Sequence, residues 1–401
     1  MTAWFRYSTA IALAVAVLLS AWAVTDLPQE GRVLAFSILS GAAFGFVLQR
    51  SRFCFYCIAR DYFEFRDANG LLGLLLALGV GLVGYYVLFS VFSPTPVAGR
   101  LPAGAHIGPV SWVLAVGAAT FGFGMALAGS CISAHLYRLG EGSLASIVAL
   151  LGAIIGFGLG FASWNPLYLA TIHDAPIVWL PHRLGYGWSL LIQLVVLFAL
   201  AAVLLRGHRA PNNSNKPSPL MSAEPNFRRL GHVLFAQRWP TYVGGLLVAA
   251  IGVMAFLRSG ALGVTAELGS IARTTAANFD LLPARLFGLD GFAGCATVVK
   301  QTLLSRNGLF VVFLIAGSWC SALLANEFRL QWPSGTALLR NFAGGVLMGW
   351  GGMLALGCTV GTLLSGIMAG ALSGWLFAVF CFLGAWLGWK LRKTGLNKFV
   401  N

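Results

Sequence analysis

Charged residues are scarce in this chain: they make up 9% of its 401 residues, whereas a soluble globular protein carries about 25%. This shortage excludes an ordinary soluble domain, because 58% hydrophobic residues are more than a protein core can hide from water. We therefore expect lipid to surround most of the chain. Long apolar runs without strict alternation argue against a membrane β-barrel. They predict an all-α, polytopic membrane protein whose 50 glycines allow close helix packing.

Motifs typical of several other protein classes are also absent. The nucleotide-binding motif G-x-x-x-x-G-K-[ST] does not occur, which disfavours an ATP-driven pump. The 6 histidines are scattered, and the C-x-x-C of Cys54 and Cys57 has no second pair, so a zinc site is not indicated. The net charge of +14 does not indicate nucleic-acid binding, because no soluble basic domain carries it. We expect neither an enzyme nor a bound cofactor or metal.

Apolar runs predict about ten membrane spans, several of them shorter than the ~20 residues that a full crossing needs. They lie near residues 8–24, 31–49, 71–93, 110–128, 143–163, 188–205, 241–257, 309–325, 341–357 and 367–389. No convincing small-residue cleavage site follows the first run, so we interpret it as a retained helix and not a signal peptide. Short spans that Gly and polar residues interrupt, at matching places in two halves, are typical of a transporter's binding site.

Basic residues predict the orientation of the chain. With the amino terminus inside, most of the 26 Lys and Arg residues fall in cytoplasmic segments, which predicts that both termini are cytoplasmic. Residues 1–206 and 241–401 form two membrane halves in this interpretation. Residues 207–240 form a Pro-, Asn- and Ser-rich cytoplasmic linker. We interpret this linker as a tether, and a docking site for a cytosolic partner is the alternative.

The two halves contain matching cysteine segments. When Cys131 is placed on Cys358, glycines of the first half fall on glycines of the second half. The matching pairs are Gly117 with Gly344, Gly122 with Gly349, and Gly124 with Gly351. The charge pattern predicts that Cys131 is reached from the cytoplasmic side of the membrane and Cys358 from the outer side. We therefore expect inverted-topology repeats, the first over about residues 31–163.

A second cysteine segment precedes each of these copies. Phe44-Gly45 comes before Cys54 in the first half, and Phe287-Gly288 comes before Cys295 in the second half. Each half then consists of a span, a cysteine segment, two spans, a cysteine segment and a span. Inverted repeats with interrupted helices hold their substrate near the middle of the bilayer, so we expect the substrate there.

The chemistry of these segments suits an anion. Gly129-Ser130-Cys131 ends one apolar run and Gly357-Cys358 ends another, so we expect short, broken helices at both. Backbone N–H groups at broken helix ends can stabilise a buried anion, and we expect such donors at Gly129, Ser130, Gly294 and Gly357. A thiol adds a weak S–H donor and a polarisable sulfur. Weak donors suit a transport pathway, because the substrate must also be released.

The stretches at residues 44–61, 121–142 and 357–366 resemble the YeeE/YedE family of bacterial sulfur-compound transporters, for which thiosulfate uptake is characterised. The resemblance covers most of the chain, from residue 31 to residue 390. It implies an hourglass-shaped protein in which Cys131, Cys295 and Cys358 pass thiosulfate along by thiol hydrogen bonds. It also implies a small cytosolic sulfurtransferase-like partner, docked on residues 50–67 or on the linker.

This chain departs from the repeat at one position. Gly361 follows Cys358, whereas Ala134 follows Cys131 at the matching place. The extra methyl group of Ala134 narrows the passage or tilts the half-helix. The pathway role that the resemblance implies therefore has less support at Cys131 than at Cys358.

Other polar residues near the cysteine segments have two interpretations each. Cys54 lines the cytoplasmic exit or is a packing residue, and the same choice, with less support for the exit, holds for Cys57. Lys300 follows Cys295 on the outer side, where basic residues are scarce, and is a candidate group for attracting anions. His135 lies one helical turn after Cys131 and donates to the substrate or is structural.

The remaining polar and sulfur-containing residues are expected to have structural roles more than substrate contacts. Arg50 and Arg52 attract anions or merely obey the positive-inside rule. Arg138 and Glu141 are spaced for a helical ion pair. Cys320 and Cys381 lie within apolar spans, and we expect both to be packing residues.

The sequence favours a multi-pass transporter of the bacterial inner membrane that takes up thiosulfate or a related sulfur anion. Transport of a selenium-containing compound is one alternative. A membrane thiol oxidoreductase is another, although it needs cysteines close enough to form a disulfide, and the main cysteines here are single. The third alternative, an anchor for a cytosolic sulfurtransferase, would not need inverted repeats with broken helices. The sequence does not indicate how transport is energised or which oligomer forms.

Overall fold

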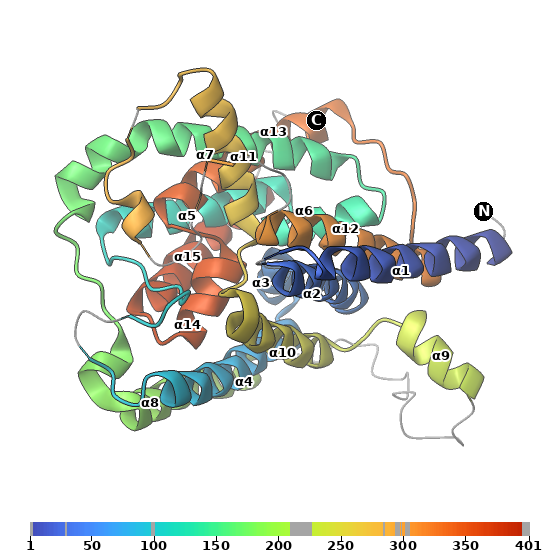
Figure 1. Cartoon of the computed structure of the whole chain (residues 1–401), viewed down its shortest axis with the longest axis horizontal. Helices are drawn as coiled ribbons and strands as arrows, with labels where there is room; N and C mark the ends of the chain where they lie inside the picture. Colours follow the sequence, from blue (N-terminus) through green and yellow to red (C-terminus); the bar gives the residue numbers. More distant parts are fainter. Residues whose placement is uncertain are drawn as a thin grey trace.

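The secondary structure of the computed structural model is helical in the part of the chain that it describes, with irregular connections between the helices, and its few β contacts are isolated bridges (Figure 1). The described residues are 3–28, 30–97, 101–208, 227–283, 285–292, 297, 299–300 and 305–394. Gly294 and Cys295, two of the predicted pathway residues, lie outside them.

The first half of the chain contains long helices separated by short breaks. Its elements are α1 (Ala3–Thr25), α2 (Gly31–Ser51), α3 (Phe55–Phe65), α4 (Asn69–Phe92), α5 (Trp112–Ala128), α6 (Ile132–Gly140), α7 (Ala145–Leu167), the π-helical turn η1 (Tyr168–Ile172) and α8 (Leu180–Gly207).

The second half follows the linker and has a similar alternation of long and short helices. Its elements are α9 (Phe227–Phe235), α10 (Thr241–Ser259), α11 (Val264–Asn278), the 3₁₀ turn η2 (Leu289–Gly291), α12 (Arg306–Leu324), α13 (Gly335–Leu354), the π-helical turn η3 (Thr359–Ser365), α14 (Gly366–Met368) and α15 (Leu372–Thr394).

Within the described residues, nine helices are long and apolar enough to cross a membrane, or ten if the bent pair of α13 with η3 and α14 is one span. This agrees with the predicted polytopic all-α fold. The short helices α3 and α6 continue the α2 and α5 spans beyond their breaks. The predicted linker is not wholly irregular, because α9 lies within it.

Helices from the two halves pack against each other in the interior. Helix α13 packs against α5 and α7, and α15 packs against α5, while α12 packs against α2 and α10 against α4. Glycines permit the closest of these crossings: a Cβ added to Gly124 would lie 2.7 Å from the carbonyl oxygen of Gly344. The same distance separates a Cβ added to Gly344 from the carbonyl oxygen of Gly124. Gly117 and Gly351 also contact each other, so the α5–α13 crossing is reciprocal.

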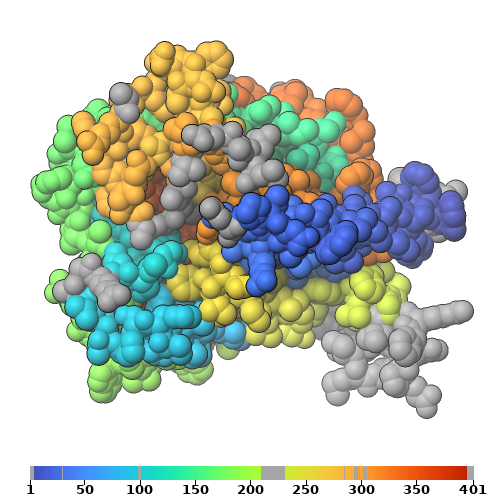
Figure 2. Space-filling view, viewed as in Figure 1, coloured from blue at the N-terminus to red at the C-terminus, as the bar shows by residue number. Residues whose placement is uncertain are grey.

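Two long helices lie at the edge of the molecule. Helix α1 runs along the outside of the bundle and α8 lies beside α4, as Figure 1 shows, and α1 forms an outer ridge in the space-filling view of Figure 2. In the most apolar 18-residue stretch of each helix, only 17% is buried inside the protein, and lipid would cover the rest. The interior of the bundle, and not these helices, therefore holds the candidate site.

The breaks after α5 and after α13 lead to opposite faces of the bundle. Helix α6 ends beside Arg329, whose N–H donates to the Glu141 carbonyl at 2.9 Å. The segment after α14 ends beside Trp179, and the N–H of Leu180 donates to the Gly370 carbonyl at 2.9 Å. We call these the Glu141 face and the Trp179 face.

One matched segment of the predicted repeat does not share a local structure. Phe44 and Gly45 lie inside α2, where Gly45 approaches Leu314 of α12. Phe287 and Gly288 instead lie in a turn that precedes η2. The likeness between these two dipeptides is therefore wrong as evidence for a repeat, because glycine serves close packing in one and a left-handed turn, with φ of 63°, in the other.

Candidate substrate pathway

The Gly-Ser-Cys segment after α5 breaks its helix, as predicted. Gly129 adopts a left-handed conformation with φ of 78°, which ends α5. The prediction that the Gly129 and Gly357 N–H groups serve as donors to the anion is wrong, because they donate to the carbonyls of Met125 and Gly352, each at 2.8 Å, and so close the ends of the preceding helices. The Ser130 hydroxyl donates to the Gly129 carbonyl at 2.7 Å, and Cys131 begins α6 from an extended conformation. Cys131 is completely buried. The break therefore places a thiol at the start of a nine-residue helix inside the protein.

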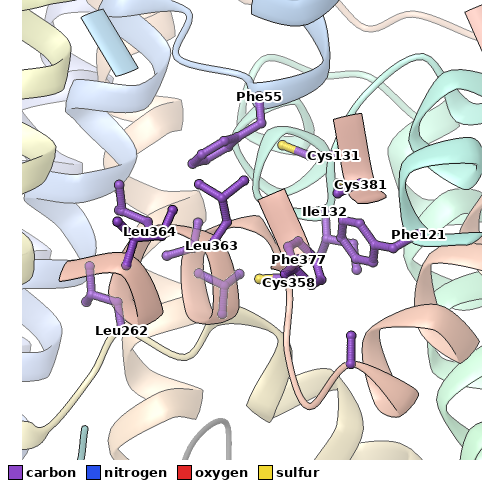
Figure 3. Packing of buried hydrophobic residues seen from close by; sticks show 14 of the residues in the cluster. Phe55, Phe121, Cys131, Ile132, Leu262, Cys358, Leu363, Leu364, Phe377 and Cys381 are labelled. Carbon is purple, nitrogen blue, oxygen red and sulfur yellow. The ribbon is translucent and has the colours of Figure 1, made fainter. Parts of the chain in front are cut away.

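The Gly-Cys segment after α13 makes a second break. Leu356 lies in the left-handed region with φ of 55°, a conformation that is unusual for a leucine. Cys358 then precedes η3, and the chain bends by 43° between α13 and the segment of η3 and α14. Cys358 is buried, and Figure 3 shows it with Cys131 among the apolar side chains of Phe55, Leu363 and Phe377.

Three cysteines gather between the first break and the α2–α3 turn. The Sγ atoms of Cys54 and Cys131 lie 3.9 Å apart, and the Sγ of Cys131 lies 3.3 Å from the Ser133 hydroxyl. The Cys57 N–H donates to the Sγ of Cys54 at 3.4 Å. Arg138 of α6 donates to the Sγ of Cys57 at 3.3 Å. We call Cys54, Cys57, Cys131, Ser133 and Arg138 the inner thiol cluster.

This cluster corrects the prediction that Arg138 pairs with Glu141. The Arg138 guanidinium reaches Cys57, whereas the Glu141 carboxylate accepts a hydrogen bond from the Gln49 side-chain amide at 3.1 Å. The two side chains are one turn apart in sequence, but α6 ends at Gly140 and they take different partners from α2 and α3. The cluster also brings Cys54 and Cys131 together, although the sequence had put them on separate segments.

Arg50 does not present a free charge that could attract anions. Its side chain is fully buried, with its Nε 3.0 Å from the Ser321 hydroxyl and one terminal nitrogen 3.1 Å from the Glu327 carboxylate. It also donates to the Ala236 carbonyl at 3.0 Å. The guanidinium therefore ties α2, α12 and the start of the second half together, and its role here is structural.

Glu327 balances the arginines around Arg50. Its carboxylate lies 3.5 Å from Arg52 and 3.3 Å from Arg238. Partial burial acts to raise the pKa of Glu327, but Arg52, the Gln49 amide, Arg50 and Arg238 outweigh burial and lower the pKa. The carboxylate is thus ionised at neutral pH and compensates the buried arginine.

His135 and Lys300 have the following surroundings. His135 is buried, its Nδ1 lies 3.3 Å from the Ser146 hydroxyl, and its Nε2 has no hydrogen-bond partner. The Lys300 ammonium pairs with the Glu267 carboxylate and lies 2.7 Å from the Ser305 hydroxyl. Because Glu267 neutralises Lys300, this lysine offers an incoming anion less attraction than a free charge would.

The other two described cysteines are not members of the inner thiol cluster. Cys320 of α12 donates to the Ala10 carbonyl of α1 at 3.4 Å, on the outside of the bundle. Cys381 lies buried in α15 and is labelled near Phe377 in Figure 3. No group of three or more His, Cys, Asp or Glu residues is arranged to hold a metal ion in the described part of the chain.

Sequence reasoning missed one polar contact beside the second break. The Nε2 of His106, from the loop before α5, lies 2.8 Å from the Thr362 hydroxyl of η3. In the sequence, His106 is one of 6 scattered histidines, and nothing near it in the chain indicates a partner. A signal was present only at Thr362, which lies one turn after Cys358 just as His135 lies one turn after Cys131.

Comparison with known proteins decides the family. A family model described as "Sulphur transport" matches residues 50–387. The chain belongs to this family. Two proteins named "Thiosulfate transporter TsuA" match almost end to end: the one from Escherichia coli is 27% identical over 87% of this chain and 92% of its own length. The one from Spirochaeta thermophila is 29% identical over 89% of this chain and 98% of its own length.

A shorter match joins the chain to a further relative. The "Probable transporter YedE" of Salmonella typhimurium is 33% identical over 22% of this chain and 23% of its own length. The full-length relatives are named as transporters, and the membrane-spanning helices of this chain agree with that role. The sulfur-transport family member described here is therefore a multi-pass membrane transporter of sulfur compounds and not an enzyme.

Proposed function

We propose that this protein takes thiosulfate, or a closely related sulfur anion, into the cytoplasm through a pathway lined by Cys358, Cys295, Cys131 and Cys54. The observation that carries the proposal is the pair of buried cysteines at two helix breaks, which lead to opposite faces of one bundle. The names of the full-length relatives support thiosulfate as the substrate.

The geometry at Cys131 suits a transient anion site. A dianion in an apolar interior is costly unless donors surround it. At this break the α6 helix begins, so its first N–H groups have no partner within the helix and lie beside the Cys131 thiol. The thiol is a weak donor and a polarisable contact for the terminal sulfur of thiosulfate. Binding of this kind is loose enough for release toward Cys54, 3.9 Å away.

The proposed mechanism includes two inverted repeats, one in residues 1–206 and one in residues 241–401. The reciprocal contacts of Gly117 with Gly351 and of Gly124 with Gly344 support it, because a two-fold axis between matching segments produces such exchanged pairs. Helix packing supports it too, since α12 on α2 is the exchanged counterpart of α10 on α4. Inverted repeats place a substrate site between two gates that can open in turn.

We orient the molecule with the Glu141 face in the cytoplasm and both termini inside. This face carries Arg50, Arg52, Arg138 and Arg238, as expected for a cytoplasmic face. In this orientation Cys358 lies toward the outer side, and the inner thiol cluster lines the exit.

A cytosolic sulfurtransferase-like protein remains the partner that we propose at this exit. Buried Arg50 cannot contribute to its docking surface. Arg60 and Asp61 in the middle of α3 have side chains that are 40% and 43% exposed, so they remain accessible. Neutralising Arg60 and Arg66 should reduce recovery of the partner with the transporter. Equal recovery would show that the partner docks elsewhere.

The proposed function is tested by growth of a bacterial strain that lacks its other sulfur importers. Cells that express this chain should grow with thiosulfate as the sole sulfur source. Cells with the empty vector should not, and both should grow on cysteine. Growth with sulfate but not with thiosulfate would overturn the substrate assignment. Accumulation of selenium in place of sulfur would favour a selenium-containing substrate.

A further inference from the structure

A deep apolar cavity leads from the edge of the bundle into its interior. Its volume is about 460 Å³, and α3, α4, α5, α8, η3, α14 and α15 contribute its lining. Side chains at its rim are exposed, such as Val203 of α8 and Leu383 of α15, whereas Thr359 and Ile367 at its floor are only 1% exposed. We call it the lateral cavity, because its rim faces the lipid and its floor lies inside the protein.

The lateral cavity adjoins both cysteine segments of the proposed pathway. Phe55 follows Cys54 in the chain, Thr359 follows Cys358, and both line the cavity. Leu363 also lines it, and Figure 3 shows this side chain beside Cys358. An occupant of the cavity would therefore contact the residues that separate the thiols from the lipid.

Hydrocarbon suits the lateral cavity better than water does. The lining is apolar except for the polar atoms of Tyr62, Thr359, Trp375 and Cys381. The indole N–H of Trp375 already donates to the Gln193 side chain at 3.1 Å. A buried water needs two to four polar partners, and waters filling this volume would lack them. An alkyl chain needs none, and it gains dispersion contacts with the lining.

The length of the lateral cavity matches one leaflet of a membrane. On α15 the lining runs from Trp375 to Ala385, ten residues further along the helix, which is about 15 Å along its axis. The hydrocarbon core of a bilayer is about 30 Å thick, so one leaflet contributes about 15 Å. On α8 the lining residues lie between Leu200 and Leu204, near the end of the helix that is remote from the Trp179 face. In the proposed orientation the cavity thus lies in the inner leaflet, and its size fits one acyl chain.

Two arginines flank the mouth of the lateral cavity. Arg66 follows α3, and its guanidinium lies 5.4 Å from the ring centre of Tyr62, which lines the cavity. Arg206 precedes Gly207, where an added Cβ would lie 3.5 Å from the Tyr62 hydroxyl. Both arginines are exposed, and neither has an ion-pair partner within the described ranges. The acidic side chains nearby have other partners: Asp61 with Arg60, Glu64 with Trp389, and Asp67 with His208. The mouth therefore presents two positive charges to an anionic head group.

We propose that the lateral cavity binds one acyl chain of an anionic phospholipid from the inner leaflet, with the lipid phosphate between Arg66 and Arg206. The bound chain packs against Phe55 and Leu363, and so it seals the pathway from the lipid and supports η3. The binding site does not depend on which anion is transported. Its placement in the inner leaflet and its effect on uptake rest on the proposed function.

Support from the chain matters because shared hydrogen bonds hold the start of η3. The Cys358 carbonyl accepts from the Thr362 N–H at 2.7 Å, as in an α-helix, and from the Leu363 N–H at 3.3 Å, as in a π-helix. Because Leu363 lines the lateral cavity, an empty cavity would leave this turn without packing contacts on one side. An occupied cavity favours the turn that presents Cys358 to the pathway, so thiosulfate uptake should depend on the lipid.

The binding test uses the purified full-length protein and a phosphatidylglycerol that carries a photoactivatable diazirine near the end of one acyl chain. After irradiation, mass spectrometry should find the label on lining residues of η3, α15 and the end of α8. Ala378→Phe fills the cavity and should lose most of this label. The matched control is Ala199→Phe, which adds the same ring at an exposed position of α8 outside the lining. Label absent from the lining, or equal label in the two variants, would overturn the site.

The head group is tested by the double variant Arg66→Gln, Arg206→Gln. Loss of two surface arginines should weaken the binding of phosphatidylglycerol about thirtyfold and that of zwitterionic phosphatidylcholine much less. The control is Arg329→Gln, which changes an exposed arginine elsewhere on the Glu141 face. Equal labelling of the wild type by the two lipids would overturn the preference for an anionic lipid. Should Ala378→Phe not fold, Ala378→Leu takes its place in the binding test.

Uptake by liposomes separates this inference from the proposed function. The liposomes contain no cytosolic partner, so Arg66 cannot act there through partner docking. The wild-type protein should take up ³⁵S-thiosulfate severalfold faster in liposomes with phosphatidylglycerol than in phosphatidylcholine alone, and the double arginine variant should lose this difference. Equal uptake by the wild type in both liposomes would overturn the support of η3 by the lipid. If neither liposome takes up label, the proposed function fails, while photolabelling still decides whether the lipid site exists.

Discussion

The Sγ atoms of Cys54 and Cys131 lie 3.9 Å apart, although 77 residues separate them in the chain. Cys54 begins α3 and Cys131 begins α6, so the two helix starts meet at these thiols. Both side chains are completely buried. A substrate that leaves Cys131 for the Glu141 face therefore has Cys54 as its neighbouring thiol.

This distance predicts that oxidation can close the exit. A disulfide needs its sulfur atoms about 2 Å apart, so a small movement suffices to join Cys54 to Cys131. A membrane-permeant diamide would take up the two electrons and two protons of the thiols, form the disulfide and block thiosulfate uptake. Dithiothreitol should restore uptake, and Cys131→Ala should not form this crosslink. Absence of a Cys54–Cys131 crosslink by mass spectrometry would contradict the geometry.

The glycine crossing predicts a stability loss from the smallest side chain. In Gly124→Ala, the new methyl group would lie 2.7 Å from the Gly344 carbonyl oxygen. Overpacking of this kind costs roughly 1–3 kcal/mol, which should lower the melting temperature in detergent. The control is Gly158→Ala in α7, where an added Cβ meets nothing within 4 Å and the alanine favours helix. Equal melting temperatures for the two variants would show that α5 and α13 do not cross so closely.

The ion pairs of Glu327 predict that the protein loses stability in acid. Its folded pKa is lowered from an ordinary value of 4.5, so its contribution is complete above that pH and is lost as the pH falls through the folded pKa. Glu327→Gln should leave Arg50 buried without its counter-charge and cost about 3 kcal/mol at pH 7. It should also flatten the fall in melting temperature as the pH is lowered below 4.5. The exposed Asp174→Asn is the control, and a Glu327→Gln protein that melts like the wild type at pH 7 contradicts this account.

The orientation predicts the location of two reporters. A fusion at Asn401 and another within residues 207–240 should both be active as cytoplasmic reporters and inactive as periplasmic ones. Fusions in the loop that contains His106 should show the reverse. A periplasmic signal at Asn401 would remove the assignment of Cys358 to the outer side.

Local patterns in the sequence predicted the long membrane-spanning helices and both breaks, but they did not predict α9 or α11. Continuous apolar runs, ended by Gly129 and by Gly357, were enough to predict where α5 and α13 stop. These features depend only on residues that are adjacent in sequence, because a glycine in the left-handed conformation, followed by polar residues, ends a helix wherever the helix lies in the fold. The family could also be predicted, since its cysteine segments are short and contiguous.

Contacts between distant segments could not be predicted in the same way. The positive-inside rule treats all arginines alike, and it could not reveal that Arg50 is buried against Glu327 of the other half. The approach of Cys54 to Cys131 depends on how α3 folds back after α2. His106 comes from a loop and reaches η3 only in the folded chain. Pairings of this kind follow from tertiary packing and not from spacing.

The central claim is that thiosulfate passes along buried thiols at the two helix breaks. Initial uptake of ³⁵S-thiosulfate, at matched protein levels in cells without other sulfur importers, tests it most directly. Cys131→Ala and Cys358→Ala remove the S–H donor and the polarisable sulfur while keeping a small apolar side chain. Each should reduce uptake by about tenfold or more, which is the loss expected when about 1.4 kcal/mol of binding is removed. The control Cys320→Ala changes a thiol that contacts α1, and it should transport like the wild type. If Cys131→Ala and Cys358→Ala take up label as fast as Cys320→Ala, these cysteines only pack the helix breaks and the account is wrong.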